Sequence, residues 1–474
     1  MENNLSPSKE IISHKGIQTL MGNPRLAIIK LSLPMILAMA LNSLYTIVDR
    51  IWVSGLGPAA LTATGFFFPV MMLMVAFAVG LGIGGGSTVS RRIGARDQQG
   101  ASNASTQTII ISLIVAVFFT IILLIFAPHL FRLMAASNEA AQPSVIDMTL
   151  TYANIMFIGT VFLFFSNIGN SLLRSEGNAN HAMIAISIGV ILNVGLDPLF
   201  IYIFKMGIAG AAWATVISQF ISCLLIAYWL FLKKQSYMSF SFKGFSFERR
   251  NLAEILRVGI PSIIMQSSMS LMMFLITIIL NYLDPLKGVA VFNAGWSIVT
   301  FATLPLLGMG TAVTSVSGAA YGARQFEKFF TIHRFAAGFG LLIEILISLL
   351  VFLAAPFISF IFTWSPETKD LASDIEGFLK VIWVFFPAMA GGITSSSFFQ
   401  GVGKGLHSLV ITLLRTLLFA VPLAYLLGVV FKMGPNGVYL GMIAASWLSS
   451  IIAFSWVSLY IKHCLKSQNV KKNS

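Results

Sequence analysis

Residues 79–96 read VGLGIGGGSTVSRRIGAR, and residues 307–324 read LGMGTAVTSVSGAAYGAR. Aligned at an offset of 228 residues, the two stretches superpose Gly80 on Gly308 and end on the same triplet, GAR. Further matches occur at offsets of 226 or 227: KLSLPMIL (30–37) with RVGIPSII (257–264), EGNANHAM (176–183) with VGKGLHSL (402–409), and KMGIAG (205–210) with KMGPNG (432–437). A chain that matches itself at one long period repeats a structural unit. We therefore expect two halves with the same fold.

The composition predicts an integral membrane protein. Of 474 residues, 57% are hydrophobic and only 10% are charged, whereas soluble proteins carry roughly 25% charged residues. Crossing ~30 Å of hydrocarbon takes about 20 apolar residues, and such runs recur along the whole chain. We predict an all-α fold with about twelve transmembrane helices at 27–53, 58–88, 106–127, 147–170, 180–203, 209–232, 252–282, 289–320, 331–355, 373–400, 406–431 and 437–461.

The repeat divides these spans into two pseudo-symmetric lobes of six helices. An even number of spans per repeat inserts both halves the same way up, so an axis along the membrane normal relates them and a central cavity is expected between them. The predicted parts are an N-terminal tail (1–26), an N-lobe (27–232), a polar linker (233–251), a C-lobe (252–461) and a basic C-terminal tail (462–474).

The net charge of +13 predicts the orientation. Lysine and arginine concentrate on the segments that are cytoplasmic if both termini are inside, as the positive-inside rule requires. We expect a multi-pass protein of the plasma (inner) membrane, whose basic residues contact lipid headgroups rather than nucleic acid. The polar first 25 residues do not resemble a signal peptide. Cys223 and Cys464 form no disulfide framework or metal motif.

Two carboxylates lie within predicted spans, Asp49 in LYTIVDRIWVSG (44–55) and Asp197 in NVGLDPLF (193–200). An ionised aspartate in hydrocarbon costs about 2.5 to 3.5 kcal/mol. The matching positions of the second half hold Ile276 and Leu423, so a shared scaffold does not require the acids. We predict that they load and release protons. For Asp49 the alternatives are an ion pair with its neighbour Arg50 or a snorkelling position at the helix end, and for Asp197 the alternative is a plain helix kink.

Polar residues accompany both acids. Asn42 and Tyr45 precede Asp49 by seven and four residues, and Asn193 precedes Asp197 by four, which places each on the same helical face as its acid. Singly, such residues are typical of interhelical hydrogen bonding, but together they predict a coupling site for a proton or cation. This site comprises Asp49, Asp197, Asn193, Asn170, Tyr45 and Thr215. Glu344, in the ninth span, is either functional or a boundary group near His333 and Arg334.

The sequence also suggests a substrate cavity without an enzyme's chemistry. Methionine side chains are flexible and suit varied apolar ligands, and the tentative cavity residues are Met39, Asn42, Met265, Gln266 and Met269. No nucleophile with a base and no metal spacing can be assembled, so we expect neither an enzyme nor a cofactor. GLGIGG (80–85) fits a dinucleotide-binding pattern but follows no predicted strand, and we interpret it as close helix packing.

Several of these motifs together resemble the multidrug and toxic compound extrusion (MATE) transporters: SLPMILAMALNSLYTIVDRIWVSGLGPAAL, VGLGIGGGSTVSRRIGARD, LLRSEGN, NVGLDPLF and GAAYGAR. The resemblance implies the MATE fold and export of organic, often cationic, compounds by alternating access in exchange for protons or sodium ions. It also implies that Asp49 and Asp197 are the family's acids on the first and fifth helices. The seventh and tenth spans carry no acid, which resembles the DinF-like branch and favours protons.

Alternatives remain open at this stage. Two acids with amide and hydroxyl oxygens could also hold Na⁺, which would make the protein a sodium-coupled antiporter. A lipid-linked saccharide flippase is a further alternative, but such proteins carry a strongly basic central cavity, whereas arginine and lysine cluster here at the loops. The expected partners are small-molecule drugs or toxic organic cations and membrane lipids, and we expect a monomer.

Overall fold

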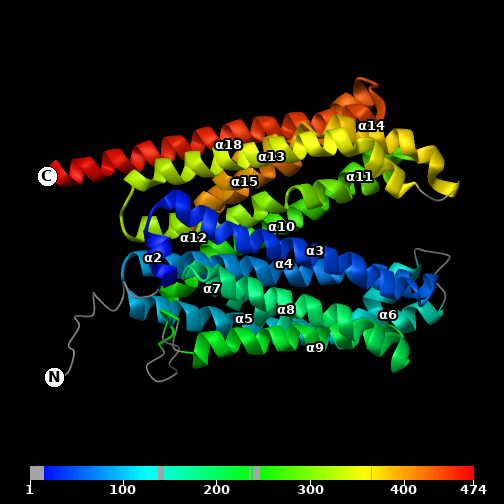
Figure 1. The fold of residues 1–474 in the computed structure, drawn as a ribbon, viewed down its shortest axis with the longest axis horizontal. Helices are drawn as coiled ribbons and strands as arrows, with labels where there is room; N and C mark the ends of the chain where they lie inside the picture. The colour runs from blue at the N-terminus through cyan, green and yellow to red at the C-terminus, as the bar shows by residue number, and fades with distance from the viewer. Residues whose placement is uncertain (1–14, 137–142, 234–235, 239–245, 364–365, 474) are drawn as a thin grey trace. The chain divides into compact units, whose positions relative to one another are not determined.

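The computed structural model describes residues 15–136, 143–233, 236–238, 246–363 and 366–473, and their regular structure is helical throughout (Figure 1). Parts of the predicted N-terminal tail, linker and C-terminal tail (1–14, 234–235, 239–245 and Ser474) lie outside the described residues.

The first half contains α2 (Lys15–Met21), α3 (Pro24–Ser54), α4 (Pro58–Gly94), α5 (Gln98–Ala136), α6 (Pro143–Ile158), α7 (Thr160–Ser175), α8 (Ala179–Pro198), the π-helix η1 (Leu199–Ile203), α9 (Ile208–Ala227) and the π-helix η2 (Tyr228–Leu232). The second half contains α10 (Arg249–Leu283), α11 (Gly288–Ala302), α12 (Leu304–Gly322), α13 (Glu327–Phe362), the 3₁₀-helix η3 (Pro366–Leu371), α14 (Ala372–Ile382), α15 (Phe385–Gly401), α16 (Gly405–Leu413), the π-helix η4 (Leu414–Ala420), α17 (Val421–Tyr425), the π-helix η5 (Leu426–Val430) and α18 (Gly434–Asn473).

The predicted membrane fold is confirmed. Among the described residues, nine helices are long and apolar enough to cross a membrane, and three bent helix pairs raise the number to twelve. The bends, of 48°, 42° and 49°, separate α6 from α7, α11 from α12 and α14 from α15, and the sequence analysis did not predict them. They fall at Gly159, at Thr303 and after Trp383. Pro305 lies in the first turn of α12, where a missing N–H costs nothing.

The backbone repeats along with the sequence. The described non-glycine residues with positive φ are Arg96 (59°), Arg324 (55°), Lys205 (56°) and Lys432 (56°), which form two pairs at the repeat offset. Arg96 N donates to Ile93 O, and Arg324 N donates to Tyr321 O. In this left-handed conformation a residue closes the end of a helix. The two halves therefore share the way their helices end as well as their sequence.

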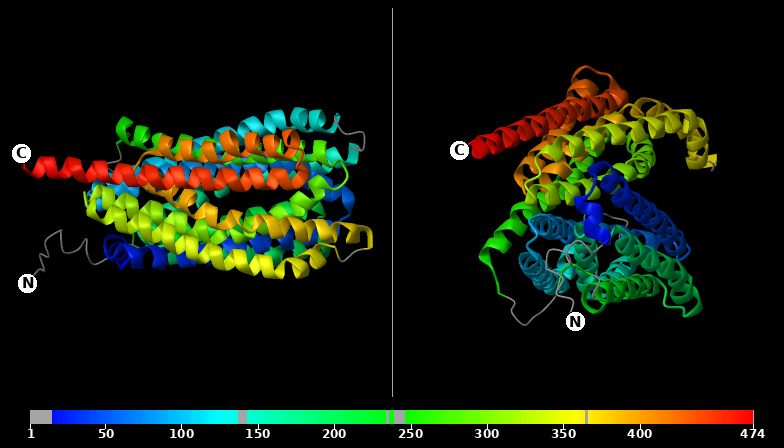
Figure 2. Two further views of the ribbon diagram at one scale, coloured as in Figure 1. Left: turned by 90° about the horizontal axis from the view of Figure 1, so that it is seen from above. Right: turned by 60° about the vertical axis from the view of Figure 1, so that its left-hand side comes forward.

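Two compact units make up the chain. One comprises residues 1–18 and 37–263, and the other comprises 19–36 and 264–474. In the first unit, α4 packs against α5 and α7, and α8 packs against α9. In the second, α12, α13 and α18 surround α15. Within each unit the helices run side by side, as Figures 1 and 2 show. The start of α3 thus groups with the second unit, and the start of α10 groups with the first.

Glycines allow the closest helix crossings, as the GLGIGG motif suggested. A methyl group added at Gly84 of α4 would collide with the carbonyl oxygen of Ile255 in α10, and one at Gly80 would lie 3.0 Å from Gly259 O. Gly308 in α12 approaches Ile36 of α3 equally closely, since its Cβ would lie 3.0 Å from Ile36 N. The interpretation of GLGIGG as close helix packing is therefore confirmed.

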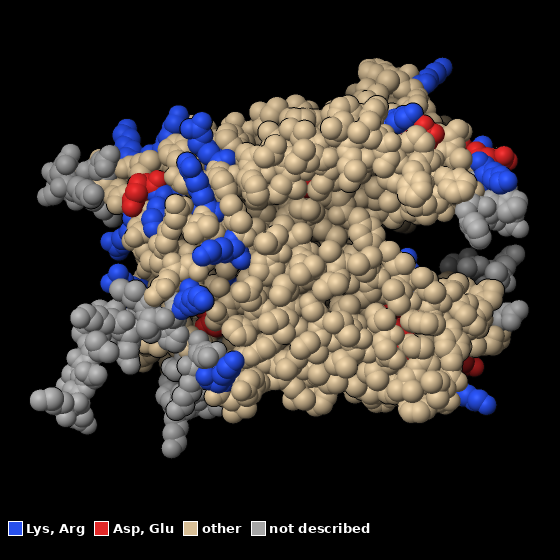
Figure 3. All heavy atoms as spheres, in the orientation of Figure 1, with Lys and Arg blue, Asp and Glu red and all other residues tan. Residues whose placement is uncertain are grey.

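Charge follows the pattern expected of a membrane protein. In both units the helix flanks seen in Figure 3 are almost bare of charged side chains, while lysines and arginines gather at the helix ends. Near one such end of the first unit, Arg91 lies 3.3 Å from Glu254, and Arg92 lies 3.4 Å from the same carboxylate. The flanks instead expose large apolar side chains, such as Leu33, Phe118 and Ile125. Lipid would cover this surface.

Candidate functional site

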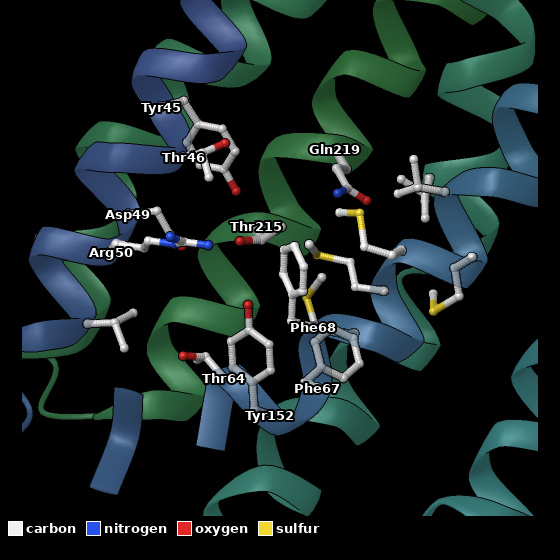
Figure 4. A pocket seen from close by; sticks show the side chains of 18 of the residues that line it. Tyr45, Thr46, Asp49, Arg50, Thr64, Phe67, Phe68, Tyr152, Thr215 and Gln219 are labelled. Carbon is white, nitrogen blue, oxygen red and sulfur yellow. The ribbon is translucent and has the colours of Figure 1, made fainter. Parts of the chain in front are cut away.

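The first unit contains a partly open cavity of about 640 Å³ beside Asp49, a volume within the usual range for sites that bind small molecules. Five helices line it: α3, α4, α6, α9 and, through Leu163, α7 (Figure 4). The lining residues are Asn42, Tyr45, Thr46, Asp49, Arg50, Val53, Leu61, Thr64, Gly65, Phe67, Phe68, Met71, Met72, Met74, Val75, Tyr152, Met156, Leu163, Thr215 and Gln219. The wall is therefore mostly apolar, with polar groups concentrated on α3 and α9.

The two predicted acids meet behind this wall. Asp49, on the last turns of α3, lies within hydrogen-bonding reach of Asp197 at the end of α8. Asp197 is fully buried. Oδ1 of each carboxyl group is buried and has no hydrogen-bond partner among the described residues. Two carboxylates in contact repel each other, so this arrangement needs a proton or a cation between them.

Asn193 connects the acids to α9. Its side-chain amide lies 3.3 Å from the hydroxyl oxygen of Thr215. With the amide nitrogen turned toward Asp197, it donates to Oδ2 at 3.0 Å, and the amide oxygen accepts from Thr215 N at 3.1 Å. This orientation satisfies both ends of the amide. The amide of Asn193 then serves Asp197 as an uncharged hydrogen-bond donor, as expected because the two residues lie four positions apart on α8.

Tyr45 and Tyr152 place two hydroxyl groups near the acids. Tyr45 of α3 hydrogen-bonds the side chain of Thr215. The ring of Tyr152, on α6, packs edge-on against Phe67 with centroids 5.2 Å apart, and both residues line the cavity. Figure 4 shows Tyr45, Asp49 and Thr215 on the same side of the cavity. The polar cluster predicted from the sequence is thus largely assembled within one unit.

Other predicted residues lie elsewhere. Asn170 of α7 is buried, and its Oδ1 has no hydrogen-bond partner among the described residues, but it does not line the cavity. Of the tentative cavity residues, only Asn42 lines it. Met39, Met265, Gln266 and Met269 do not. Met265 is buried in the second unit, where its sulfur accepts a hydrogen bond from Ser408 at 3.3 Å. Their part in substrate binding stays a prediction.

Several lining residues escaped the sequence analysis. Arg50 was considered only as a partner of Asp49, although it also faces the cavity. Phe68, Tyr152 and Gln219 belong to no motif, because a helix face can be recognised from sequence but the cavity it faces cannot. The dense run MMLM (71–74) of α4 was the one available signal. Three of its four residues line the cavity.

Two further charges lie inside spans of the second unit. Glu344 of α13 is fully buried, and neither carboxylate oxygen has a hydrogen-bond partner among the described residues. His333, which was expected near Glu344 if that acid is a boundary group, contacts Phe454 O at 3.3 Å. Arg415 lies in η4, in the middle of the span Gly405–Val430. The expectation that arginine and lysine cluster at the loops overlooked this residue.

Within the described residues, no group of three or more histidine, cysteine, aspartate or glutamate side chains could hold a metal ion. The two cysteines are both unpaired thiols. The acid pair, with its amide and hydroxyl neighbours, is instead suited to holding a proton or a monovalent cation beside a cavity of drug-like size. Such a site can bind and release a proton or a cation, and it supplies no nucleophile for catalysis.

Comparisons with known proteins point to one family. A model of the MatE family matches the chain twice, over residues 34–199 and 261–426. The probable multidrug resistance protein YpnP of Bacillus subtilis is 27% identical over 435 residues, covering 91% of this chain and 94% of that protein. The FAD transporter of Shewanella oneidensis is 25% identical, covering 84% and 87%. A solved structure, the outward-facing conformation of a multidrug resistance MATE family transporter of the MOP superfamily, is 40% identical with a TM-score of 0.92, covering 95% and 99%.

Proposed function

The chain belongs to the MATE family of multidrug efflux transporters, and we propose that it exports organic, often cationic, compounds in exchange for protons. The contact between the carboxyl groups of Asp49 and Asp197 carries this proposal. One of these groups faces a cavity large enough for a drug, and the other is fully buried behind it. A proton and a cationic substrate can therefore compete for the same negative charge.

The proposed cycle follows from that competition. With the pair deprotonated, its negative charge attracts a cationic substrate into the cavity, where aromatic and methionine side chains contact its apolar part. Protonation of the pair removes the attraction, and the substrate leaves. Asn193, which Thr215 holds through a hydrogen bond, donates its amide to the carboxyl group of Asp197. The same residues that hold the proton thus also set the affinity for the substrate.

The available driving force is sufficient. One charge moved through 100 mV yields about 2.3 kcal/mol. At about 1.4 kcal/mol per tenfold change in concentration, a single proton supports a gradient of roughly fortyfold for a substrate that carries no net charge. A monovalent cation exchanged for one proton moves no net charge, so the membrane potential drives its export only when at least two protons enter per substrate.

We propose that the protein lies in the plasma membrane with both termini in the cytoplasm. The basic residues at the helix ends support this orientation through the positive-inside rule. Residues Arg91 and Arg92 of α4 lie at such an end, as does Lys462 of α18. We further propose that one chain suffices for transport, because the acid pair and the cavity beside it belong to a single unit.

Sodium coupling is the second candidate, and the unpartnered buried oxygens favour it. Oδ1 of Asp49 and Oδ1 of Asp197 accept no hydrogen bond from the described residues, and hard cations prefer such oxygen ligands. A sodium ion between the carboxylates would relieve their repulsion as a proton does. The cycle would otherwise be unchanged.

The test uses purified protein in proteoliposomes loaded with ethidium or norfloxacin. One set receives a pH gradient without sodium, and another receives a sodium gradient without a pH difference. Asp49→Asn should abolish transport driven by the pH gradient. The matched control is Asp147→Asn, which removes an exposed acid at the start of α6 in the same unit and should transport like the wild type.

Each result has a distinct meaning. Transport driven by pH alone and lost only in Asp49→Asn supports the proton antiporter. Transport driven only by sodium favours the second candidate. Undiminished transport in Asp49→Asn would contradict both, because both place the coupling ion on that carboxylate.

A further inference from the structure

Arg50 brings a positive charge into the cavity of the first unit. It follows Asp49 on α3, and both residues line that cavity. In Figure 4 the side chain of Arg50 extends from α3 in the direction of Thr215 on α9. Arg50 lies only four residues before Ser54, where α3 ends, so the end of the helix is about 6 Å away. A long basic side chain can reach water at such an end, but this one lines the cavity instead.

The guanidinium group of Arg50 is available to a ligand. None of the ion pairs among the described residues includes Arg50, so the ion pair with Asp49 considered from the sequence does not form. Asp49 lies close enough to interact with the charge of Arg50, but that carboxyl group also contacts Asp197. Arg50 is exposed, and a guanidinium group offers five N–H donors. These donors can therefore reach a molecule in the cavity.

The repeat shows that the fold does not require this arginine. Thr277 occupies the matching position of the second half, at the same offset that matches Asp49 with Ile276. The hydroxyl group of Thr277 donates to the backbone carbonyl of Met273 on its own helix at 2.8 Å, so the second half completes this turn without a charge. Ionisable residues within membrane spans are costly and usually functional. A shared scaffold therefore explains neither Asp49 nor Arg50.

The cavity wall combines one charge of each sign with aromatic side chains. Among the described residues that line it, Arg50 is the basic one and Asp49 the acidic one. Phe67, Phe68 and Tyr152 supply aromatic rings, which can pack against the flat body of an organic compound. A guanidinium group binds two oxygens of a carboxylate or phosphate at once, because its planar fork matches their geometry. The wall is thus suited to an aromatic compound that carries an oxyanion as well as an amine.

We propose that Arg50 is a specificity-determining residue of this cavity, which binds the oxyanion of organic substrates that carry one, such as the carboxylate of a zwitterionic drug. The proposal rests on the export function proposed above and refines its substrate class. Asp49 attracts the cationic group of such a compound and Arg50 attracts its oxyanion, and both residues line one cavity within one unit. Purely cationic substrates do not use Arg50.

The test compares norfloxacin with its carboxamide, which keeps the amine and nearly the same size but lacks the negative charge. Binding is measured by the fluorescence anisotropy of the ligand, on the full chain in neutral phosphatidylcholine nanodiscs. The pH is one at which the carboxyl group of norfloxacin is ionised. The wild type should bind norfloxacin about tenfold more tightly than the carboxamide, which corresponds to about 1.4 kcal/mol.

Substitutions of Arg50 test whether its charge causes this preference. Arg50→Gln should lose the preference without binding the carboxamide more weakly, since the substitution removes a charge that repels the amine. Arg50→Lys should keep part of the preference, because lysine retains the charge but not the planar fork. The matched control, Arg132→Gln, alters an exposed arginine of α5 outside the cavity wall and should keep all of the preference.

The proposal would be overturned if the wild type binds both compounds equally, a result that needs no variant to fold. It would also be overturned if Arg50→Gln keeps the preference or weakens the binding of both compounds by the same factor. Adding phosphatidylglycerol to the nanodiscs tests a lipid phosphate as the source of the oxyanion. If this lipid weakens norfloxacin binding in the wild type but not in Arg50→Gln, the phosphate occupies the site and the substrate assignment is wrong. Unchanged binding supports the substrate assignment.

The carboxamide also separates this inference from the export function. If proteoliposomes export the carboxamide under a pH gradient but norfloxacin binds no more tightly than the carboxamide, only the role of Arg50 fails. If neither compound is exported under any gradient, the proposed function fails first.

Discussion

The hydroxyl group of Tyr202 donates a hydrogen bond to the backbone carbonyl of Trp52 at 2.6 Å. Trp52 follows Asp49 by three residues on α3, and Tyr202 follows Asp197 by five in η1. The bond therefore joins the two chain segments that carry the acids. The two rings also pack edge-on, with centroids 6.2 Å apart. Movement of the end of α3 away from η1 must break this contact.

Tyr202→Phe should loosen the end of α3 while keeping the ring contact. Losing one hydrogen bond costs roughly 0.5–1.5 kcal/mol, which should speed amide hydrogen exchange in a peptide covering residues 49–57 by up to about tenfold. Hydrogen exchange with mass spectrometry measures it. Tyr228→Phe, which alters a different exposed tyrosine in η2, is the control. Equal exchange in wild type and Tyr202→Phe would show that the bond does not hold α3.

Asn193→Leu should impair coupling without removing an acid. Leucine has a similar size but leaves Asp197 without its amide donor, and a buried group deprived of a partner costs about 1–3 kcal/mol. We expect a lower thermal unfolding temperature and loss of transport driven by a pH gradient, both measured on the same preparation. Asn193→Asp is the informative companion, since a third carboxyl group beside Asp197 should shift the pH profile of transport. A wild-type pH profile in both variants would contradict this role.

Gly84→Ala should destabilise the crossing of α4 and α10. The added methyl group would collide with the carbonyl oxygen of Ile255, which cannot move without shifting the helix. Overpacking of this kind typically costs 1–3 kcal/mol, measurable as a lower unfolding temperature in detergent. Gly65→Ala, on the same helix, places its methyl group in open space and should be neutral or slightly stabilising, since alanine favours helix more than glycine does. Equal unfolding temperatures for both variants would count against a tight crossing.

Stability should fall as pH rises toward 7 because of Glu176, which lies between α7 and α8 outside the spans. Burial raises the pKa of this carboxyl group from 4.5 to about 7, although hydrogen bonds from Ser236, Asn178 and the backbone of the linker oppose the shift. A pKa that is higher in the folded state means that the folded protein binds the proton more tightly. The stability that the folded protein gains from binding this proton is thus complete below about pH 4.5 and is lost as the pH rises through 7. It amounts to at most about 3 kcal/mol.

Glu176→Gln should therefore flatten the dependence of the unfolding temperature on pH between 5 and 8, and should exceed the wild type above pH 7. Glu248→Gln is the matched control, because that exposed side chain also lies near the linker, where it accepts a hydrogen bond from Asn103 at 2.6 Å. It should leave the slope unchanged. A slope that persists in Glu176→Gln would assign the titration to another group.

The sequence was sufficient for most of the fold because two strong signals coincide. Hydrophobic runs of membrane-spanning length predicted the spans, and the repeat predicted their division into two sets of six. The bend at Gly159 was not predicted, because glycine is common in membrane helices and most do not break them. Prolines do not mark the bends either. Pro34 and Pro261 lie inside continuous helices, whereas the bend between α6 and α7 contains none.

The candidate site was predictable only as a set of residues. Their spacing placed Asn193 on the face of Asp197, but the contact between Asp49 and Asp197 depends on how α3 lies against α8, which no local pattern specifies. Arg415 escaped for a different reason. A hydropathy value averaged over a whole span does not reveal one charged residue within it. The count of basic residues considered only the loops and so left out those inside the spans. Its surroundings distinguish it: Nη1 of Arg415 donates to the sulfur of Met389, and none of the ion pairs among the described residues includes Arg415.

The exchange of short segments between the two units has a consequence for any attempt to divide the molecule. A cut within the linker 233–251 would leave residues 19–36 on the N-terminal fragment and residues 252–263 on the C-terminal one. Each fragment would then carry a strip that completes the core of the other. We therefore expect that neither fragment folds when it is expressed alone. The fragments should instead complement each other when synthesised in the same cell, as two halves of one split protein.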